Sequence, residues 1–335
     1  MSTAGPLPVL SACGVHVTFP GRRGRGLARA LDGVNLDVYP SEILALVGES
    51  GCGKTTLART LLGLERPSAG DVRFAGVPLA YSARSLRTYR RRVQLVLQDP
   101  MGALNPRHTV YEAVAEGLRI HGAEALGSFG DEGTKVADAL SRAGLRPPER
   151  FFPRYPHELS GGQRQRVVIA GALVLDPQVI VADEPVASLD ASVRGEILKL
   201  LLALRDDSGL SALVATHDLG LAWNVADRVA VMYLGRIVET GPVETILRSP
   251  EHPYTRALLS VASTAGGNPP VILSGEAPDP SHVPAGCRFH PRCPALASGV
   301  AAAAGIAEAC RSLDPGVLPG GQGAGVACHL YPPSS

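Results

Sequence analysis

The chain has 335 residues, a length that suggests about two domains. Its 32 Lys and Arg residues nearly balance 31 Asp and Glu residues. The resulting net charge of +1 argues against a protein that works mainly by coating nucleic acid, which needs a basic surplus or patch. Hydrophobic residues make up 45% and charged residues 19%, so the composition supports a packed core and excludes global disorder.

Membrane and targeting segments are not evident in the sequence. No stretch reaches the roughly 18 consecutive apolar residues that a membrane-spanning helix needs. The best candidate, 167–175, ends at Asp176 and Pro177. Residues 1–10 have neither the basic nor the apolar region of a secretory signal. We therefore expect a cytosolic chain that does not cross a membrane by itself.

The first 265 residues alternate short apolar runs with amphipathic helical segments. Four runs suit buried, mostly parallel strands: 43–47, 93–97, 179–182 and 212–215. The clearest helix is 192–205, where apolar residues form one stripe. Strands that alternate with helices predict an α/β fold around a central sheet.

The glycine-rich segment after the first strand has the pattern of a phosphate-binding loop. It reads Gly48-Glu49-Ser50-Gly51-Cys52-Gly53-Lys54-Thr55, and a helical segment starting at Thr56 follows it. Such a loop wraps backbone N–H groups around a phosphate at the positive end of a helix dipole. We expect Lys54 to meet the β- and γ-phosphates and the Thr55 hydroxyl to bind Mg²⁺. Cys52 is interpreted as a tolerated small side chain rather than a nucleophile.

Residues 99–158 interrupt the alternation of strands and helices. Two helical stretches, 110–120 and 134–143, are joined by a glycine-rich loop, and no strand is convincing there. We interpret this block as a helical insertion. Past Ala265 the sequence becomes rich in Pro and Gly with little periodicity, which predicts a domain of residues 1–265 and an appendage of residues 266–335.

Two further motifs also have the residues that phosphate binding and phosphoryl transfer need. Residues 159–166, LSGGQRQR, open a helix with small residues and exposed amides, which makes a second anion-binding helix start. The apolar run 179–182 ends in Asp183 and Glu184. In phosphate-loop enzymes this arrangement places the first carboxylate near Mg²⁺, and the second can act as general base on the attacking water.

These motifs together resemble the nucleotide-binding subunit of an ABC transporter over roughly residues 8–260. The resemblance rests on the loop at 48–55, Gln98 after a strand, LSGGQ at 159–163, Asp183 and Glu184, Asp190, and His217 at the end of a strand. It implies an ABC-type P-loop NTPase fold: a RecA-like α/β core with an antiparallel β subdomain and a helical subdomain at 99–158, followed by a small Cys-rich appendage.

The family's site residues can be placed on the matching positions. Glu184 and His217 would be catalytic. Residues 48–55, Thr56 and Gln98 would bind ATP, and Thr55, Gln98 and Asp183 would hold Mg²⁺. Phe19 stands where members stack an aromatic ring on adenine, with Phe for the usual Tyr, and a core Phe is its rival interpretation. The residues implied to contact a partner subunit's ATP are Ser160, Gly161, Gly162, Gln163 and Asp190, although the usual Ser-Ala-Leu before that aspartate is here Ala187-Ser188-Leu189.

Three longer segments resemble the dipeptide and oligopeptide importer ATPases: 98–107 (QDPMGALNPR), 154–159 (RYPHEL) and 252–259 (HPYTRALL). Nickel importer ATPases share much of the sequence of these segments. The resemblance therefore favours peptide as the imported substrate and leaves nickel open as an alternative. It implies ATP hydrolysis coupled to import. The implied partners are a second ABC ATPase (heterodimer or homodimer), two transmembrane permeases and, indirectly, an extracytoplasmic binding protein. It places the chain at the cytoplasmic face of the plasma membrane.

Two rival functions come from other classes. One is a soluble ABC-type ATPase acting on DNA or ribosomes, whose members usually carry coiled-coil or zinc-module insertions or two ATP-binding units, and neither feature is evident here. We accordingly expect no nucleic-acid partner. The other is a regulatory ATP-binding module without catalysis, against which Glu184 and His217 are both intact.

Four of the six cysteines lie in the appendage, at Cys287, Cys293, Cys310 and Cys328. In a reducing compartment such a cluster is more typical of metal binding than of disulfides. Four thiolates suit Zn²⁺ or an iron–sulfur cluster. The missing C-x-x-C pair weakens zinc, and some family members carry a [4Fe–4S] centre here, so a [4Fe–4S] cluster is the prediction. His290 and His329 keep zinc open, and free or paired cysteines remain the third alternative.

Overall fold

The computed structural model describes residues 6–21, 26–187, 189–262 and 271–331. The chain divides into two compact units, which are described separately. The first comprises Met1–Val38, Leu44–Leu79 and Ala215–Ser335, and the second comprises Tyr39–Ile43 and Ala80–Val214. The expected boundary at residue 265 lies outside the described residues.

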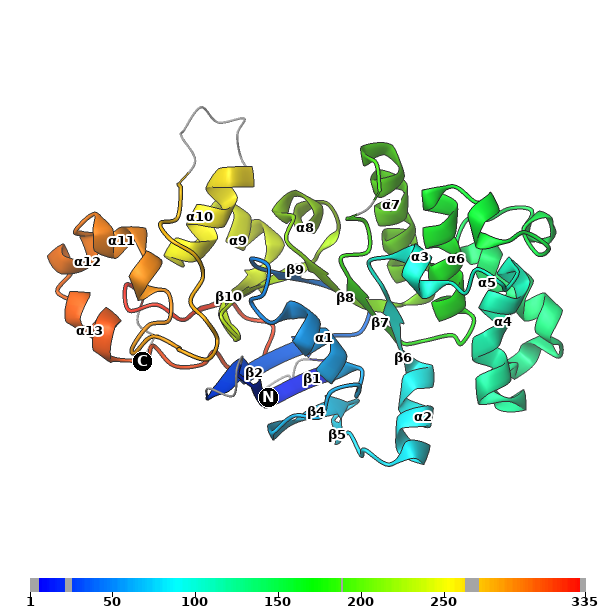
Figure 1. Ribbon diagram of the computed structural model, residues 1–335, viewed down its shortest axis with the longest axis horizontal. Helices are drawn as coiled ribbons and strands as arrows, with labels where there is room; N and C mark the ends of the chain where they lie inside the picture. The colour runs from blue at the N-terminus through cyan, green and yellow to red at the C-terminus, as the bar shows by residue number, and fades with distance from the viewer. Residues whose placement is uncertain (1–5, 22–25, 188, 263–270, 332–335) are drawn as a thin grey trace. The chain divides into compact units, whose positions relative to one another are not determined.

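The first unit contains an antiparallel sheet in the order β2-β1-β4-β5. Its strands are β1 (Leu10–Pro20), β2 (Leu27–Val38), β4 (Ala69–Phe74) and β5 (Val77–Pro78). In the register of β1 with β2, Leu10 faces Val38 and Phe19 faces Ala28. Helix α1 (Lys54–Leu61) packs against β1 and β2, and it buries Leu57 and Leu61 (Figure 1).

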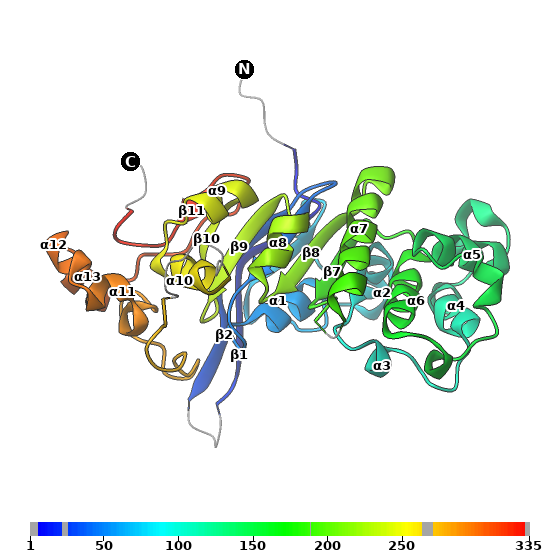
Figure 2. The ribbon, with the colours of Figure 1, turned by 90° about the horizontal axis from the view of Figure 1, so that it is seen from above.

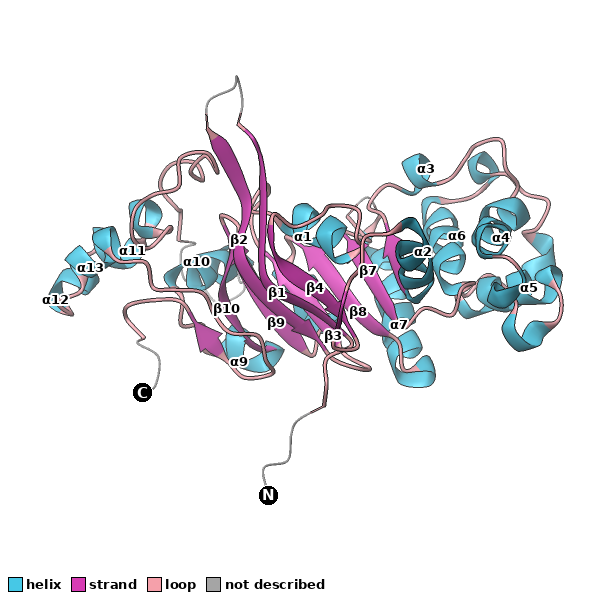
Figure 3. Cartoon of the chain, turned by 90° about the horizontal axis from the view of Figure 1, so that it is seen from below, coloured by secondary structure: helices cyan, strands magenta, loops and turns pink. Residues whose placement is uncertain are grey.

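A second set of strands in the first unit has the order β11-β10-β9-β3. Strand β3 (Ile43–Val47) runs parallel to β9 (Arg228–Tyr233), while β10 (Arg236–Pro242) is antiparallel to both β9 and β11 (Gly325–Val326). Every residue of β3 and β9 is buried. This explains why β3 is apolar throughout rather than alternating, as expected for a strand covered on both faces. Figure 3 shows β9 and β10 side by side.

The helices that follow in the first unit are α8 (Leu219–Val225), α9 (Val243–Arg248) and α10 (Pro253–Ala262). Past residue 270 come three short helices, α11 (Pro294–Ala297), α12 (Val300–Ala303) and α13 (Ala307–Ser312), which lie close together in Figure 2. Strand β11 then joins β10, with Val326 opposite Glu239. The C-terminal segment therefore completes a sheet of the first unit as well as carrying the cysteines.

The second unit contains strands in the order β8-β7-β6. These are β6 (Val93–Val96), β7 (Val179–Asp183) and β8 (Ser211–Thr216), and β6 and β7 pair in parallel. Helix α2 (Ala83–Arg92) precedes β6, and α7 (Ala191–Ser208) lies between β7 and β8 in sequence. The strands and the helix expected at 192–205 are thus present, and no end is shifted by more than three residues.

The regular elements within residues 99–158, all of which the structure describes, are helices joined by loops. They form α3 (Pro100–Ala103), α4 (Val110–His121) and α5 (Glu132–Arg142), with 3₁₀ turns at Ala123–Ala125, Gly127–Phe129, Pro148–Arg150 and Pro156–Glu158. Helices α4 and α5 pack against each other and against α6 (Gly161–Leu173) (Figure 1). A capping box between Thr109 and Glu112 fixes the start of α4.

Candidate nucleotide-binding site

The phosphate-binding loop connects the buried strand β3 to the N-terminus of α1. Gly53 has a φ of 116°, and a Cβ there would lie 2.7 Å from the Ala30 carbonyl oxygen, so only glycine fits. Ser50, Gly51 and Thr55 are exposed at the surface of this loop. The sequence thus folds into a loop with an accessible helix N-terminus, which is the geometry that binds phosphate.

Lys54 is the buried cation of this loop. Its side chain is 6% exposed, and Nζ donates to the Gly48 carbonyl at 2.7 Å and to the Glu49 carbonyl at 3.0 Å. Burial raises the pKa of the neighbouring Cys52 thiol, which agrees with its interpretation as a small packing residue because the thiolate is the nucleophilic form. The Cys52 carbonyl accepts from the Gly235 N–H at 2.8 Å and so ties the loop to the turn between β9 and β10.

Two other predicted site residues lie in the first unit. Phe19, near the end of β1, is 37% exposed, so the rival interpretation as a core residue does not describe its position. His217 is exposed and directly follows β8. The next residue, Asp218, caps α8 by accepting from the Leu221 N–H at 3.1 Å. His217 is thus held between the end of a strand and a capped helix.

In the second unit, Gln98, Asp183 and Glu184 meet at one edge of the strands. The register pairs Val96 of β6 with Ala182 of β7. Because parallel strands end at the same edge, Gln98 and Glu184, each two residues past that pair, emerge together. Glu184 has a φ of 48°, in the left-handed region that non-glycine residues occupy mainly where surrounding structure holds them, often at functional sites.

The LSGGQ segment forms the start of α6. Ser160 Oγ accepts from the Gln163 N–H at 3.2 Å, and Gln163 Oε1 accepts from the Ser160 N–H at 3.0 Å, which makes a capping box. Ser160 is exposed, but Gly162 is buried so closely against α7 that a Cβ would lie 2.5 Å from Val193 Cγ1. Among the residues predicted to touch a partner's ATP, Ser160 is therefore accessible and Gly162 has a packing role.

Asp190 caps the N-terminus of α7. Its Oδ1 accepts from the Val193 N–H at 2.9 Å and from the Ser192 hydroxyl at 2.7 Å. These hydrogen bonds, the first of them foremost, lower the pKa of the Asp190 carboxyl. The preceding Ser188, part of the departure from the usual family text, lies outside the described residues.

The four C-terminal cysteines line one small apolar cavity together with His252, His290 and His329. Burial raises the pKa of Cys287 to about 12 and that of Cys328 to about 11. His290 Nδ1 lies 3.0 Å from the Cys287 carbonyl, and His329 Nε2 lies 2.9 Å from the Leu313 carbonyl. Within the described ranges, no three His, Cys, Asp or Glu side chains are grouped so that they could hold a metal ion.

Sequence reasoning missed two residues that contact the phosphate-binding loop. Tyr254 Oη accepts from the Glu49 N–H at 2.9 Å, and the Arg292 guanidinium donates to both Glu49 carboxylate oxygens at 2.7 and 3.1 Å. Tyr254 lies within the segment 252–259 that resembles the importer ATPases, and Arg292 directly precedes Cys293. No local pattern connects residues more than 200 positions apart, so the sequence held no signal for this contact.

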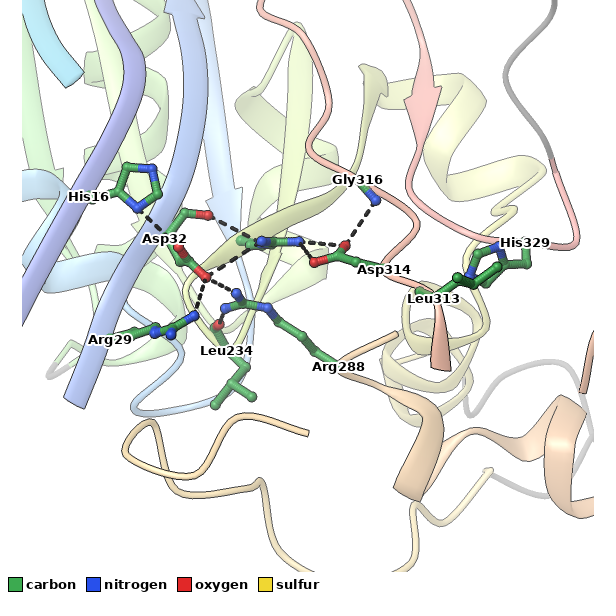
Figure 4. A network of polar contacts seen from close by, with 10 residues as sticks. His16, Arg29, Asp32, Leu234, Arg288, Leu313, Asp314, Gly316 and His329 are labelled. Atoms are coloured by element: carbon green, nitrogen blue, oxygen red, sulfur yellow. Dashed lines mark hydrogen bonds and ion pairs between the residues drawn. The ribbon is translucent and has the colours of Figure 1, made fainter. Parts of the chain in front are cut away.

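A second ion-pair network joins the C-terminal segment to the ATP-binding part of the first unit (Figure 4). The buried Arg288 pairs with Asp32 of β2 and donates to the Leu234 carbonyl at 2.6 Å. Arg236 donates to Asp314 Oδ1 at 2.6 Å and to the Asp32 carbonyl at 3.1 Å. Although burial alone would raise the pKa of Asp32, the charges of Arg288 and Arg236 lower it below the ordinary value.

Comparison with known proteins agrees with these motifs. The family model for ABC transporters matches residues 31–187, and the model for the oligopeptide/dipeptide transporter C-terminal region matches residues 238–298. The dipeptide transport ATP-binding protein DppF of Haemophilus influenzae is 42% identical over 294 residues, which span 85% of this chain and 88% of that protein. The oligopeptide transport ATP-binding protein AppF of Bacillus subtilis is 38% identical over 343 residues, which span 99% and 100%.

Solved structures support the same fold. CbiO1 from Clostridium perfringens, part of the ABC transporter complex cbiONQ, superposes with a TM-score of 0.64 at 30% identity and covers 72% of this chain and 91% of its own. The ATP-binding cassette MJ0796, solved as a dimer with ADP and phosphate, gives a TM-score of 0.60 at 28% identity, with 70% and 98% covered. The expected ABC-type α/β fold is thereby confirmed, and the chain belongs to the ABC transporter family as one of its ATPase subunits.

Proposed function

We propose that this chain powers the import of peptides through an ABC transporter. The observation that carries the proposal is the pair of relatives named for dipeptide and oligopeptide transport, which match over most of the chain, together with the matching C-terminal region at 238–298. The rival soluble ATPase acting on DNA or ribosomes is not favoured, because the similarity extends through that transporter-type region. Nickel import by the same subfamily remains as an outcome of the test below.

The proposed catalytic cycle uses the residues at the loop and strand ends. Residues 48–56 bind the ATP phosphates with their backbone amides and Lys54, and Phe19 stacks on the adenine ring. Thr55, Gln98 and Asp183 would hold Mg²⁺, which would neutralise negative charge on the phosphates. Glu184 accepts a proton from water while that water's oxygen bonds to the γ-phosphorus, and the bond from this phosphorus to the bridging oxygen breaks to give ADP and phosphate. His217 donates a hydrogen bond to the γ-phosphate.

The chain has one phosphate-binding loop and one LSGGQ segment. We propose that each ATP is enclosed by the loop of one chain and by Ser160 to Gln163, with Asp190, of another, so that ATP binding closes a dimer. The partner is a sister ATPase or a second copy of this chain. No described helix has the length and apolarity to span a bilayer. Two separate permeases would hold the pair peripherally at the cytoplasmic face of the membrane, and an extracytoplasmic binding protein would deliver the cargo.

The C-terminal cysteines have a donor set that fits a [4Fe–4S] cluster. Four thiols converge on one apolar cavity, and such a cluster takes one thiolate at each of its four irons rather than several donors on a single ion. We propose that Cys287, Cys293, Cys310 and Cys328 hold it within a C-terminal domain of residues 266–335, which follows the ATPase domain of residues 1–265 and packs in the same compact unit as part of it. When bound, the cluster would cross-link a segment that buries few apolar side chains of its own.

Elemental analysis of anaerobically purified chain tests the cluster. We expect about four irons and four sulfides per chain, and Cys293→Ser should lower this content and make residues 271–331 sensitive to protease. The matched control is Cys13→Ser in β1, which should leave the iron content unchanged. One zinc without iron would show that the metal is wrong, and metal-free protein would show that the cysteines are free.

The cargo is tested with the transporter assembled from this chain, its partner ATPase and its permeases. We expect ATP hydrolysis to rise when a peptide-loaded binding protein is added and to stay at the basal rate with a nickel-loaded one. Stimulation by the nickel-loaded binding protein and not by the peptide-loaded one would show that the cargo is nickel rather than peptide. Hydrolysis that responds to neither binding protein but rises with DNA or ribosomes would contradict the importer function.

A further inference from the structure

Glu49 is a residue of the phosphate-binding loop whose backbone and side chain both bond to distant residues of the first unit. Its N–H donates to Tyr254 Oη at 2.9 Å, and its carbonyl accepts from Lys54 Nζ at 3.0 Å. Its two carboxylate oxygens accept hydrogen bonds from the two terminal nitrogens of Arg292 at 2.7 and 3.1 Å. The amide, carbonyl and side chain of one loop residue are therefore all bonded, although the proposed chemistry gives the carboxylate no role.

Arg292 is itself held firmly in place. Its side chain is 8% exposed, and the guanidinium carbon lies 6.0 Å from the centroid of the Tyr233 ring. The Tyr233 ring packs against Tyr254 at 4.7 Å and against Phe289 at 5.2 Å between centroids. A bidentate arginine–carboxylate pair fixes direction as well as distance. The position of Glu49 is thus set by a packed aromatic cluster.

The segment that carries Arg292 is anchored at two points. It runs from Cys287 to Cys293, with Arg288 after the first cysteine and Arg292 before the second. Arg288 pairs with Asp32 and donates to the Leu234 carbonyl in the turn between β9 and β10 (Figure 4). Arg292 contacts the loop residue Glu49 itself. The segment therefore supplies one anchoring contact and one contact to the ATP site.

We propose that Arg292 is a positioning residue for the ATP site, and that through Glu49 it holds the loop backbone in its phosphate-binding shape. The C-terminal segment thereby sets the affinity for ATP. The inference rests on ATP binding at residues 48–56. A phosphate-binding loop binds its ligand with backbone N–H groups that point at the phosphate, and these groups bind well only when their directions are fixed before the ligand arrives. A contact that fixes the loop backbone should therefore raise the affinity for ATP.

Equilibrium ATP binding to the full chain, measured for Arg292→Gln, Glu49→Gln and the double variant, tests this role. Each single change should weaken ATP binding about five- to tenfold, less than the full contribution of one charge-assisted hydrogen bond because the contact acts on ATP only through the loop. The double variant should be no weaker than either single one, because both changes remove the same contact. Arg292→Lys, which keeps the charge without the bidentate fork, should lie in between.

Arg288→Gln is the matched control, since it removes the ion pair of a similarly buried arginine of the same segment and removes no direct contact with the loop. It should lower the thermal midpoint of unfolding as Arg292→Gln does, yet leave the ATP dissociation constant within about twofold. In the assembled transporter, Arg292→Gln should raise the KM for ATP and leave kcat unchanged, as expected for lost binding rather than lost chemistry.

Three results would overturn the positioning role. Parent affinity in Glu49→Gln and Arg292→Gln would show that the contact does not act on the site. Tighter binding by Glu49→Gln with weaker binding by Arg292→Gln would show a simple charge effect on the phosphates instead. Equal weakening by Arg288→Gln would show that the segment only stabilises the fold. If Arg292→Gln does not fold, the ATP affinity of Glu49→Gln alone decides whether the contact acts on the site. A parent chain that binds no ATP would instead contradict the ATPase function itself.

Discussion

The phosphate-binding loop and the Cys287–Cys293 segment lie in the same unit but are built in opposite ways. The loop follows the fully buried strand β3 and leads directly into α1, so its place in the fold is set by neighbours in sequence. The C-terminal segment is held by ion pairs to residues 243 and 256 positions away. The comparison teaches that local burial forms the ATP site, whereas long-range charge contacts attach the segment that touches it.

The same difference explains what the sequence could predict. Apolar runs and glycine spacing predicted β3, β6, β7, β8 and the loop at 48–55, because their period and turn chemistry are local. The 37% exposure of Phe19, the positive φ of Glu184 and the burial of Gly162 depend on tertiary packing. The Arg292–Glu49 contact depends on a chain path that no residue pattern encodes.

The largest expected effect tests the locally built site. Glu184→Gln should lower ATP hydrolysis by the assembled transporter about 10²- to 10⁴-fold, because the amide cannot accept the proton of the attacking water. ATP binding should survive, and a closed dimer should accumulate. Phosphate release and gel filtration with ATP measure the two effects. Glu196→Gln, on the exposed face of α7, is the control and should hydrolyse at the parent rate.

The next effect tests the long-range ion pair that attaches the Cys287–Cys293 segment to β2. Asp32→Asn should cost about 3 kcal/mol of the free energy of unfolding, because it leaves the buried Arg288 without its counter-charge. Denaturant titration at pH 7 measures it. Asp71→Asn, which removes an exposed pair with Arg73, should cost less than about 1 kcal/mol. Equal costs for the two variants would contradict a strong attachment through Asp32.

The Asp32 contribution should also depend on pH with a defined sign. Its pKa in the folded chain lies below the ordinary 3.8, so the stabilisation is complete above 3.8 and is lost as pH falls through the lower folded value. The difference in unfolding free energy between the parent and Asp32→Asn should therefore shrink as pH falls below 3.8. A difference that grows as pH falls below 3.8 would contradict the ion pair.

A smaller effect sharpens the role of the loop cation. Lys54→Ala should weaken ATP binding about 10- to 100-fold, as expected when a charged hydrogen-bond donor to phosphate is removed. The full chain titrated with a fluorescent ATP analogue provides the measurement. Lys199→Ala on the exposed part of α7 should bind as the parent does. Unchanged binding by Lys54→Ala would mean that ATP is held elsewhere.

The most direct test of the shared ATP site is the specific rate of ATP hydrolysis as a function of protein concentration. The isolated chain at dilutions where it is monomeric should be nearly inactive, and the rate per chain should rise only when a second LSGGQ segment is supplied by its partner ATPase or by self-association. Addition of the Lys54→Ala chain as an LSGGQ donor should restore activity only if the chain forms a homodimer. The full rate of the assembled transporter, reached by the monomer alone and independent of concentration, would contradict the account.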